Sequence, residues 1–169
     1  MEALEAIFSR RSVRQFLDKP IPNEMVDSIL KAAMAAPSAM NEQPWHFLLI
    51  RDKKLLIEIP KFSIHAKMCV KAPMSILVCG DLQLEKFPGL WVQSCSAATE
   101  NILLAIHGNG LGGVWTGVYP NEDRVWGFRK LLHLPKEIVP FALIVLGYPD
   151  GKPSAENRYD PAKVHVNKW

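Results

Sequence analysis

The sequence lacks a long apolar run, a polybasic tail and a recognisable signal sequence, and each absence excludes a class of protein. No stretch of its 169 residues approaches the length that crosses a bilayer, so we expect no membrane partner. The formal net charge is only +3 and basic residues are spread along the chain, which argues against a nucleic-acid partner. The first residues, MEALEAIFSRRS, carry two glutamates before any basic residue, unlike a signal peptide.

Cysteine is also scarce and follows no motif. Cys69, Cys79 and Cys95 have spacings that match neither a zinc site nor a redox pair, so we expect reduced, buried thiols in a cytoplasmic protein. The five histidines are scattered, and none belongs to an HExxH motif or a carboxylate-histidine cluster. We therefore expect no metal site.

What is present is typical of one globular domain over residues 1–169, with 49% hydrophobic and 22% charged residues. Apolar spacing predicts helices over 1–9, 22–36, 94–109 and 122–135. Apolar runs predict strands over 45–51, 74–80, 112–118 and 139–149. The helix at 94–109 is apolar around nearly its whole circumference, so it is either the central buried helix or packs on a second subunit. The expected fold is helices packed on a small sheet, α+β or mixed α/β.

The stretch RRSVRQF, residues 10–16, gathers three arginines around a serine. If the segment is extended, Arg10, Ser12 and Arg14 point to one side, where two guanidinium groups and a hydroxyl match a phosphate dianion. If it is helical, Arg10 and Arg14 share a face at i, i+4 and still favour an anion between them. The alternative is a solvated, mildly basic loop.

The sequence lacks the usual nucleotide-binding motifs, and this absence limits which anion the arginines could bind. No GxxxxGK[ST] loop is present, and GNGLGG at 108–113 follows a helix, which is the wrong order for a dinucleotide-binding turn. We therefore expect side chains to hold the phosphate of a single monoester or mononucleotide.

Five motifs then follow one another in a family-specific order: RRSVRQF, AAPSAMNEQPWHFLLI, GLGGVWTG, LGYP and NRYDPAKVHVNKW. With them the chain resembles the nitroreductase family of FMN-dependent oxidoreductases over essentially its whole length. The resemblance implies an α+β fold, a three-layer α-β-α sandwich around a mixed, mainly antiparallel sheet, with the C-terminal strand exchanged in a homodimer. It also implies two FMN molecules at the subunit interface, each contacted by both chains.

The resemblance assigns site residues by position. The family's phosphate and ribityl contacts correspond to Arg10, Arg11, Ser12 and Arg14, and a second phosphate contact corresponds to Arg158. The segment that the other subunit lays against the flavin corresponds to Pro37, Ser38, Ala39 and Asn41. The stretch that lines the ring from its own subunit corresponds to Trp115, Thr116 and Gly117. The loop after Pro37 also has free backbone groups for the polar edge of the ring.

The implied activity is transfer of reducing equivalents from NAD(P)H through FMN to a small electron-poor acceptor, such as a nitroaromatic or a quinone, with ping-pong kinetics. FMN carries the chemistry, so no catalytic side chain is expected, and Arg14 or a backbone amide near residue 116 would stabilise charge on the reduced ring. One alternative is a non-catalytic module that binds or stores FMN. Another is a specialised reductase for dehalogenation or flavin breakdown, although residues 80–94 leave little room for a long lid.

The tryptophans and the tail complete the expectations. Trp45 is expected in the core, Trp115 in the core or at the cofactor, and Trp91 in a polar connecting segment where it roofs the pocket or is half exposed. The tail KVHVNKW, residues 163–169, alternates like an exposed or edge strand and ends on a tryptophan, which predicts that it docks on a surface. The family resemblance implies docking on the partner subunit as an added edge strand, and the alternative is a tail folded back on its own domain.

Overall fold

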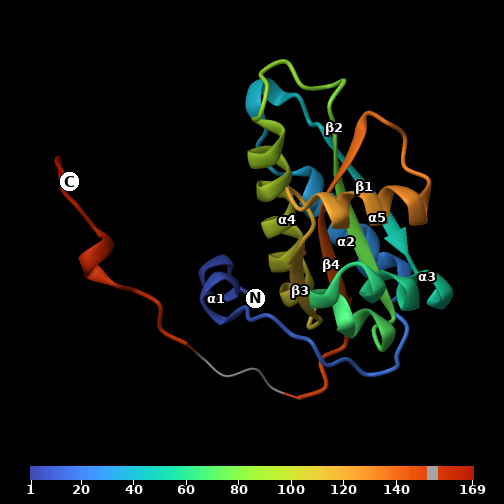
Figure 1. Cartoon of the computed structure of the whole chain (residues 1–169). Coiled ribbons are helices and arrows are strands. Elements are labelled where there is room, and N and C mark those ends of the chain that lie inside the picture. Colours follow the sequence, from blue (N-terminus) through green and yellow to red (C-terminus); the bar gives the residue numbers. More distant parts are fainter. Residues whose placement is uncertain (152–155) are drawn as a thin grey trace.

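In a computed structural model, which describes residues 1–151 and 156–169, four antiparallel strands form one sheet with helices on both faces (Figure 1). The strands are β1 (Trp45–Ile50), β2 (Met74–Asp81), β3 (Gly112–Gly117) and β4 (Ile138–Gly147), in the order β1-β2-β4-β3. The helices are α1 (Ala3–Ser9), α2 (Asn23–Met34), α3 (Lys53–Glu58), α4 (Trp91–Gly108) and α5 (Glu122–Leu132). The predicted α+β fold is confirmed.

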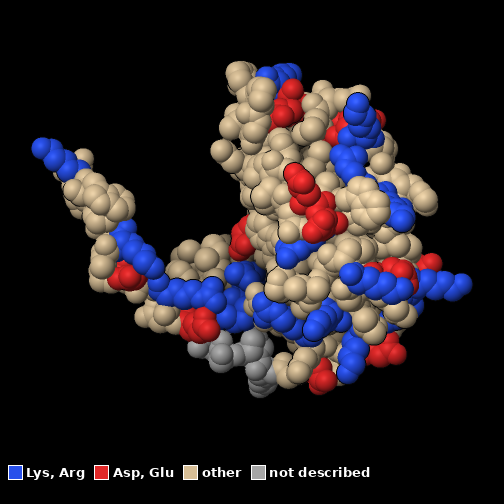
Figure 2. All heavy atoms as spheres, in the orientation of Figure 1, with Lys and Arg blue, Asp and Glu red and all other residues tan. Residues whose placement is uncertain are grey.

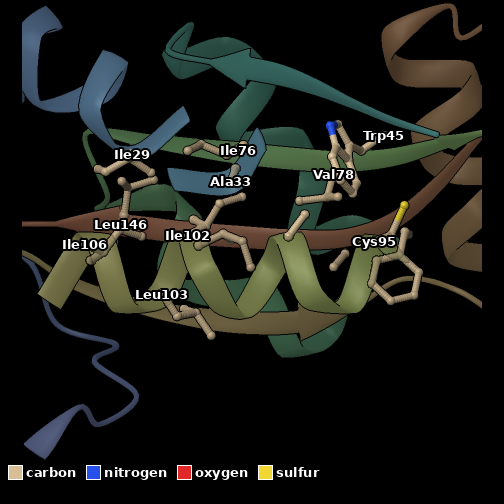
Figure 3. Packing of buried hydrophobic residues seen from close by; sticks show 14 of the residues in the cluster. Ile29, Ala33, Trp45, Ile76, Val78, Cys95, Ile102, Leu103, Ile106 and Leu146 are labelled. Carbon is tan, nitrogen blue, oxygen red and sulfur yellow. The ribbon is translucent and has the colours of Figure 1, made fainter. Parts of the chain in front are cut away.

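Two apolar cores lie on the two faces of the sheet. Helices α2 and α4 cover one face, where Ile29, Ile76 and Ile102 belong to one cluster (Figure 3). On the other face, helices α3 and α5 and the segments next to α3 enclose a second cluster that includes Leu77 and Phe128. Because side chains alternate along a strand, neighbours in β2 such as Ile76 and Leu77 enter different cores. The result is the expected three-layer sandwich.

The sequence predicted four of the five α-helices and all four strands, but it missed the short elements between β1 and β2. Helix α3 begins after Asp52, whose side chain accepts a hydrogen bond from the Lys54 N–H at 2.8 Å. Two 3-10 segments follow, Ile59–Lys61 and Ile64–Val70. Elements of this length are too short for a period to be read from apolar residues.

Trp91 is a core residue, which corrects the expectation that it lies in a connecting segment. It opens α4 with 5% of its surface exposed. Its ring centroid lies 4.9 Å from that of Tyr119 and 5.8 Å from that of Phe141, both in edge-to-face arrangements. The N-cap residue is Leu90, which makes no side-chain capping bond, so no capping residue marked the start of the helix. Trp45, as predicted, is also buried.

Both ends of the chain expose apolar side chains. In α1, Leu4, Ile7 and Phe8 are 65%, 50% and 70% exposed. The C-terminal segment runs away from the body (Figure 1), and Trp169 is fully exposed at its end. Residues 156–169 contain a 3-10 turn, Pro161–Lys163, and no strand. The predicted strand at 163–169 is therefore not formed within one chain, since a strand requires a neighbouring backbone to pair with.

The three cysteines are free and buried, as predicted. Burial raises the pKa of each thiol, in Cys69, Cys79 and Cys95, to about 12. Within residues 1–151 and 156–169, no three His, Cys, Asp or Glu side chains form a group that could hold a metal ion. None of the helices in these ranges combines the length and the apolarity that a bilayer crossing requires.

Candidate functional site

The arginine-rich segment leaves α1 as an extended strand-like chain beside β3. Ser12 forms a parallel bridge with Gly113, and the Val13 N–H donates to the Gly113 carbonyl at 2.9 Å. The Val13 side chain packs where a Cβ on Gly112 would lie, so glycine allows this close approach. Phe16 then anchors the segment in the core. The extended alternative of the two predicted geometries is therefore the correct one.

Arg10 and Arg11 each carry a buried nitrogen that lacks a partner. The Nε atoms of both make no hydrogen bond within the described residues. Arg10 Nε lies 3.4 Å from a carboxylate oxygen of Glu100 in α4, without hydrogen-bond geometry. Arg11 instead donates through Nη1 to the carbonyls of Phe8 (2.9 Å) and Arg10 (2.6 Å) and through Nη2 to that of Glu156 (2.6 Å). A buried donor without an acceptor is unfavourable, so these two side chains favour an anion.

A hollow of about 430 Å³ brings Arg158 to the same place. Its charged lining residues are Arg10, Arg11, Glu156 and Arg158. Arg158 holds Glu156 in an ion pair with an N–O distance of 2.6 Å, and this hydrogen bond lowers the pKa of the carboxyl. Three guanidinium groups against one carboxylate leave the described lining positively charged. Figure 2 shows Lys and Arg side chains gathered where the C-terminal segment meets the body.

Arg14 lines a different hollow, of about 510 Å³, together with Gln15, Lys67, Lys71 and Asp150. In an extended chain, the Cα atoms of residues 10 and 14 lie about 13 Å apart, and the two side chains line different hollows. The expectation that Arg10, Ser12 and Arg14 share a phosphate therefore stays a prediction. Arg10 lies with Arg11 and Arg158, Arg14 lies with two lysines, and Ser12 is exposed between them in the sequence.

Lys67 and Lys71 are candidate site residues that the sequence analysis missed. Lys67 belongs to the 3-10 segment Ile64–Val70. Lys71 is the first residue after this segment and precedes β2. The pair KMCVK is visible in the sequence as two lysines four residues apart. No periodic pattern places this short segment beside Arg14, because the contact depends on how the chain returns across the sheet.

The loop between α2 and β1 has a strained backbone. Three of its residues have positive φ: Met40 (47°), Asn41 (55°) and Gln43 (50°). Side chains with a Cβ rarely adopt this region, and such strain concentrates at functional sites. The Ser38 hydroxyl accepts from the Gln43 N–H at 3.0 Å, and the Ser94 hydroxyl in α4 accepts from the Ala39 N–H at 3.4 Å. The predicted loop at Pro37–Asn41 is thus present and held by specific bonds.

Within one chain, the Pro37–Asn41 loop does not lie beside the hollow that Arg10 and Arg11 line. Ala39 is bonded to Ser94, near the start of α4. Arg10 and Arg11 instead share a hollow with His107, in the last turn of the same helix. From Ser94 to His107 an α-helix rises about 20 Å. The two predicted halves of the site therefore lie at opposite ends of α4 in the single chain.

The third predicted stretch, Trp115 to Gly117, lies on the edge strand β3. The Trp115 ring packs on Phe141 with a centroid distance of 5.8 Å. Thr116 is buried, and its hydroxyl donates to the Leu143 carbonyl at 3.1 Å. The Trp115 and Thr116 side chains make their contacts within the chain. A ligand would therefore meet the backbone of this stretch, along the edge of β3 that faces away from β4.

Comparisons with known proteins identify the family of the chain. The sequence model of the family described as "Nitroreductase family" matches residues 7–73 and 71–148. A protein of Methanothermobacter thermautotrophicus, named "Putative NADH dehydrogenase/NAD(P)H nitroreductase", is 50% identical over 169 residues, which cover 100% of this chain and 88% of the relative.

Solved structures give the same result. A protein of Bacteroides thetaiotaomicron with that same name superposes with a TM-score of 0.95 at 42% identity, covering 99% of this chain and 98% of the other. An FMN-dependent nitroreductase of Clostridium difficile superposes with a TM-score of 0.91 at 28% identity, covering 98% and 99%. Sequence, fold and the order of the motifs therefore agree that the chain belongs to the nitroreductase family.

Proposed function

We propose that this protein is an FMN-dependent oxidoreductase that passes electrons from NAD(P)H to small electron-poor acceptors such as nitroaromatics and quinones. The observation that carries the proposal is the arginine hollow of a nitroreductase fold, where Arg10 and Arg11 keep buried nitrogens that make no hydrogen bond to any residue the structure describes. A phosphate monoester supplies the acceptors that these nitrogens lack. The names of the relatives supply the reaction class, NAD(P)H oxidation by an FMN-dependent enzyme.

The residues of the chain fit FMN. Arg10, Arg11 and Arg158 would hold the phosphate at one end, and Arg14 with Lys67 would face the ribityl chain or the ring from the neighbouring hollow. When bound, FMN would supply the redox chemistry, since it can accept a hydride from NAD(P)H and return two electrons to the acceptor. The fixed positive charge of Arg14 and Lys67 would stabilise negative charge on a reduced ring without needing to move. The open edge of β3 adds backbone groups for the ring.

We further propose that the working form is a homodimer with FMN at the interface. Within one chain, the Pro37–Asn41 loop and the arginine hollow lie at opposite ends of α4, so a second copy would have to supply one of them. The exposed apolar side chains of α1 and of the C-terminal segment offer the surface that such an interface would bury. In this arrangement each flavin would lie between the arginines of one subunit and the strained loop of the other.

The first experiment is an absorption spectrum of the purified protein, with the flavin identified after denaturation. FMN that is bleached anaerobically by NAD(P)H, and restored to the oxidised spectrum by one equivalent of a quinone or by a nitroaromatic, supports the proposed enzyme. Parallel lines in double-reciprocal plots would support ping-pong kinetics. FMN that binds but is not reduced by NAD(P)H would indicate the storage module. A protein that binds no added FMN would overturn the proposal.

A further inference from the structure

His107 lies beside the two arginines that the proposed function places at the phosphate, yet neither the fold nor the proposed chemistry uses it. It belongs to the last turn of α4. Together with Arg10 and Arg11 it lines a hollow of about 200 Å³ between the segment that follows α1, the end of α4 and the start of β3, separate from the hollow that contains Arg158. Three potential cations therefore surround one small, otherwise mainly apolar space.

The hydrogen bonds of Ser9 determine which ring nitrogen of His107 carries a proton. The Ser9 hydroxyl donates its only hydrogen to the Glu5 carbonyl at 2.6 Å. The same oxygen lies 2.7 Å from His107 Nε2, so in this contact it can only accept. Nε2 therefore bears a hydrogen, and Nδ1 is the nitrogen that gains or loses a proton. The contact also fixes the ring relative to α1.

The charges around His107 favour its neutral form when no anion is present. Burial lowers its pKa first, Arg10 and Arg11 lower it further, and Glu5 in α1 acts in the opposite direction. Two further residues with charged groups lie close by: Glu100 in α4, which faces Arg10, and the N-terminal residue Met1, which lines the same hollow. A negative ligand beside the arginines would reverse the balance, since it attracts an imidazolium and offsets the guanidinium charge.

Arg10 and Arg11 line both hollows, so a phosphate held by them lies between Arg158 and His107. We propose that His107 is a further cationic group for the FMN phosphate, in addition to Arg10, Arg11 and Arg158, and a positioning residue that takes up a proton when the phosphate binds. The inference rests on the proposed function and predicts that FMN affinity depends on pH. Because binding raises the pKa of the ring, FMN binds more tightly when His107 can be protonated. Affinity falls as pH rises through the pKa of the bound state, and each unit by which the phosphate raises that pKa is worth tenfold in affinity.

The test compares wild-type protein with His107→Gln, which keeps an N–H for Ser9 but cannot titrate. Dissociation constants for FMN and riboflavin are measured on flavin-free protein from pH 5.5 to 8.5. We expect wild-type protein to bind FMN about tenfold more tightly than the variant at pH 5.5, and equally tightly above pH 8. Titration of the FMN phosphate itself affects both proteins and cancels in the ratio. Riboflavin should show no difference at any pH.

The matched control is His46→Gln on β1, whose exposed ring lies 3.4 Å from Asp81 and away from the arginines. It should follow the wild type at every pH. A second measurement uses wild-type protein only: the His107 ring is titrated by NMR without ligand, with FMN and with inorganic phosphate. The pKa should rise with FMN, and with phosphate alone at sufficient concentration.

The outcomes separate the two proposals. If the wild type binds FMN but its affinity relative to H107Q does not change with pH, or the ring pKa does not rise on binding, His107 has no such role while the proposed function stands. If neither protein binds FMN, the proposed function itself fails. If H107Q does not fold, the wild-type NMR titration still decides.

Discussion

The indole of Trp91, at the start of α4, occupies the space that a side chain on Gly80 of β2 would require. The contact joins the first turn of the longest helix to the end of a central strand. This contact also explains why Trp91 is buried although it lies at the end of a helix. Glycine is needed at residue 80 because of this close approach, and not because of its backbone angles.

Replacing Gly80 with alanine should therefore displace Trp91 and destabilise the fold by roughly 1–3 kcal/mol, the usual penalty for overpacking a core. Urea unfolding followed by tryptophan fluorescence measures the effect. Gly108→Ala is the matched control, because nothing lies within 4 Å of a Cβ built there. Equal stability of G80A and G108A would show that α4 can shift freely and that this contact is not restrictive.

The separation of Arg10 from Arg14 predicts different ligand profiles for Arg10→Gln and Arg14→Gln. R10Q should lose FMN affinity by tens- to hundreds-fold, about 2–3 kcal/mol for a charge-assisted contact, with little change for riboflavin. R14Q should weaken FMN and riboflavin by similar factors, because its hollow lies away from the phosphate end. Fluorescence titration with both flavins measures this, with Lys54→Gln on the exposed face of α3 as the control. Equal losses of both ligands in R10Q would contradict its placement.

The exposed C-terminal segment predicts an effect of truncation on assembly. Deleting residues 162–169 should weaken the proposed dimer and also FMN binding, since Arg158 lies just upstream on the same segment. Light scattering across a dilution series and flavin titration measure the two effects. A full-length protein that is an FMN-loaded monomer at micromolar concentration would rule out the dimer. A truncated protein with unchanged assembly and affinity would show that the tail has neither role.

The buried thiols predict a loss of stability in alkali. From the ordinary value of 9.0, the folded state raises each pKa to about 12. Between these values the unfolded chain releases thiol protons that the folded chain retains, so the free energy of unfolding falls as pH rises above 9. The fall is about 1.4 kcal/mol per pH unit for each thiol at most.

Urea unfolding between pH 8 and 10.5 measures this slope. Cys95→Ala removes one of the three titrating thiols, so its slope should be shallower by about a third of the thiol contribution. The comparison cancels lysine and tyrosine titration, which both proteins share. Identical slopes would mean that the Cys95 thiol ionises as easily in the folded protein as in the unfolded one.

Periodic apolar patterns were sufficient to predict the long elements, because helices such as α2 and strands such as β4 bury a regular face. They failed where structure is set by contacts distant in sequence. Trp91 begins a helix that has no capping side chain, so nothing local revealed that it packs on Gly80. Lys67 lies in a 3-10 segment without a usable period, and its place beside Arg14 depends on the tertiary path of the chain.

The arginine cluster shows the same limit. Its expected preference for an anion followed from the residues in either an extended or a helical conformation, but the choice of the extended one and the division between two hollows did not. Period-two geometry gives the side to which Arg10 and Arg14 point, whereas the surrounding elements determine which space each side chain reaches. Likewise, Pro37 was sufficient to predict the Pro37–Asn41 loop. Its distance from the arginines could not be predicted, because it depends on the hydrogen bond between Ala39 and Ser94 in α4.

The two cores share the central strands β2 and β4, which contribute alternate side chains to each. If either helical layer detached, it would expose apolar residues of these strands, such as Ile144 in one core or Leu77 in the other. The remaining layer packs on the same two strands. The free energies of opening are therefore coupled, and the body should unfold in a single cooperative transition. Amides of β2 and β4 should exchange with deuterium only through that global event, whereas those of α1 and the C-terminal segment, which lack buried contacts, should exchange through local opening.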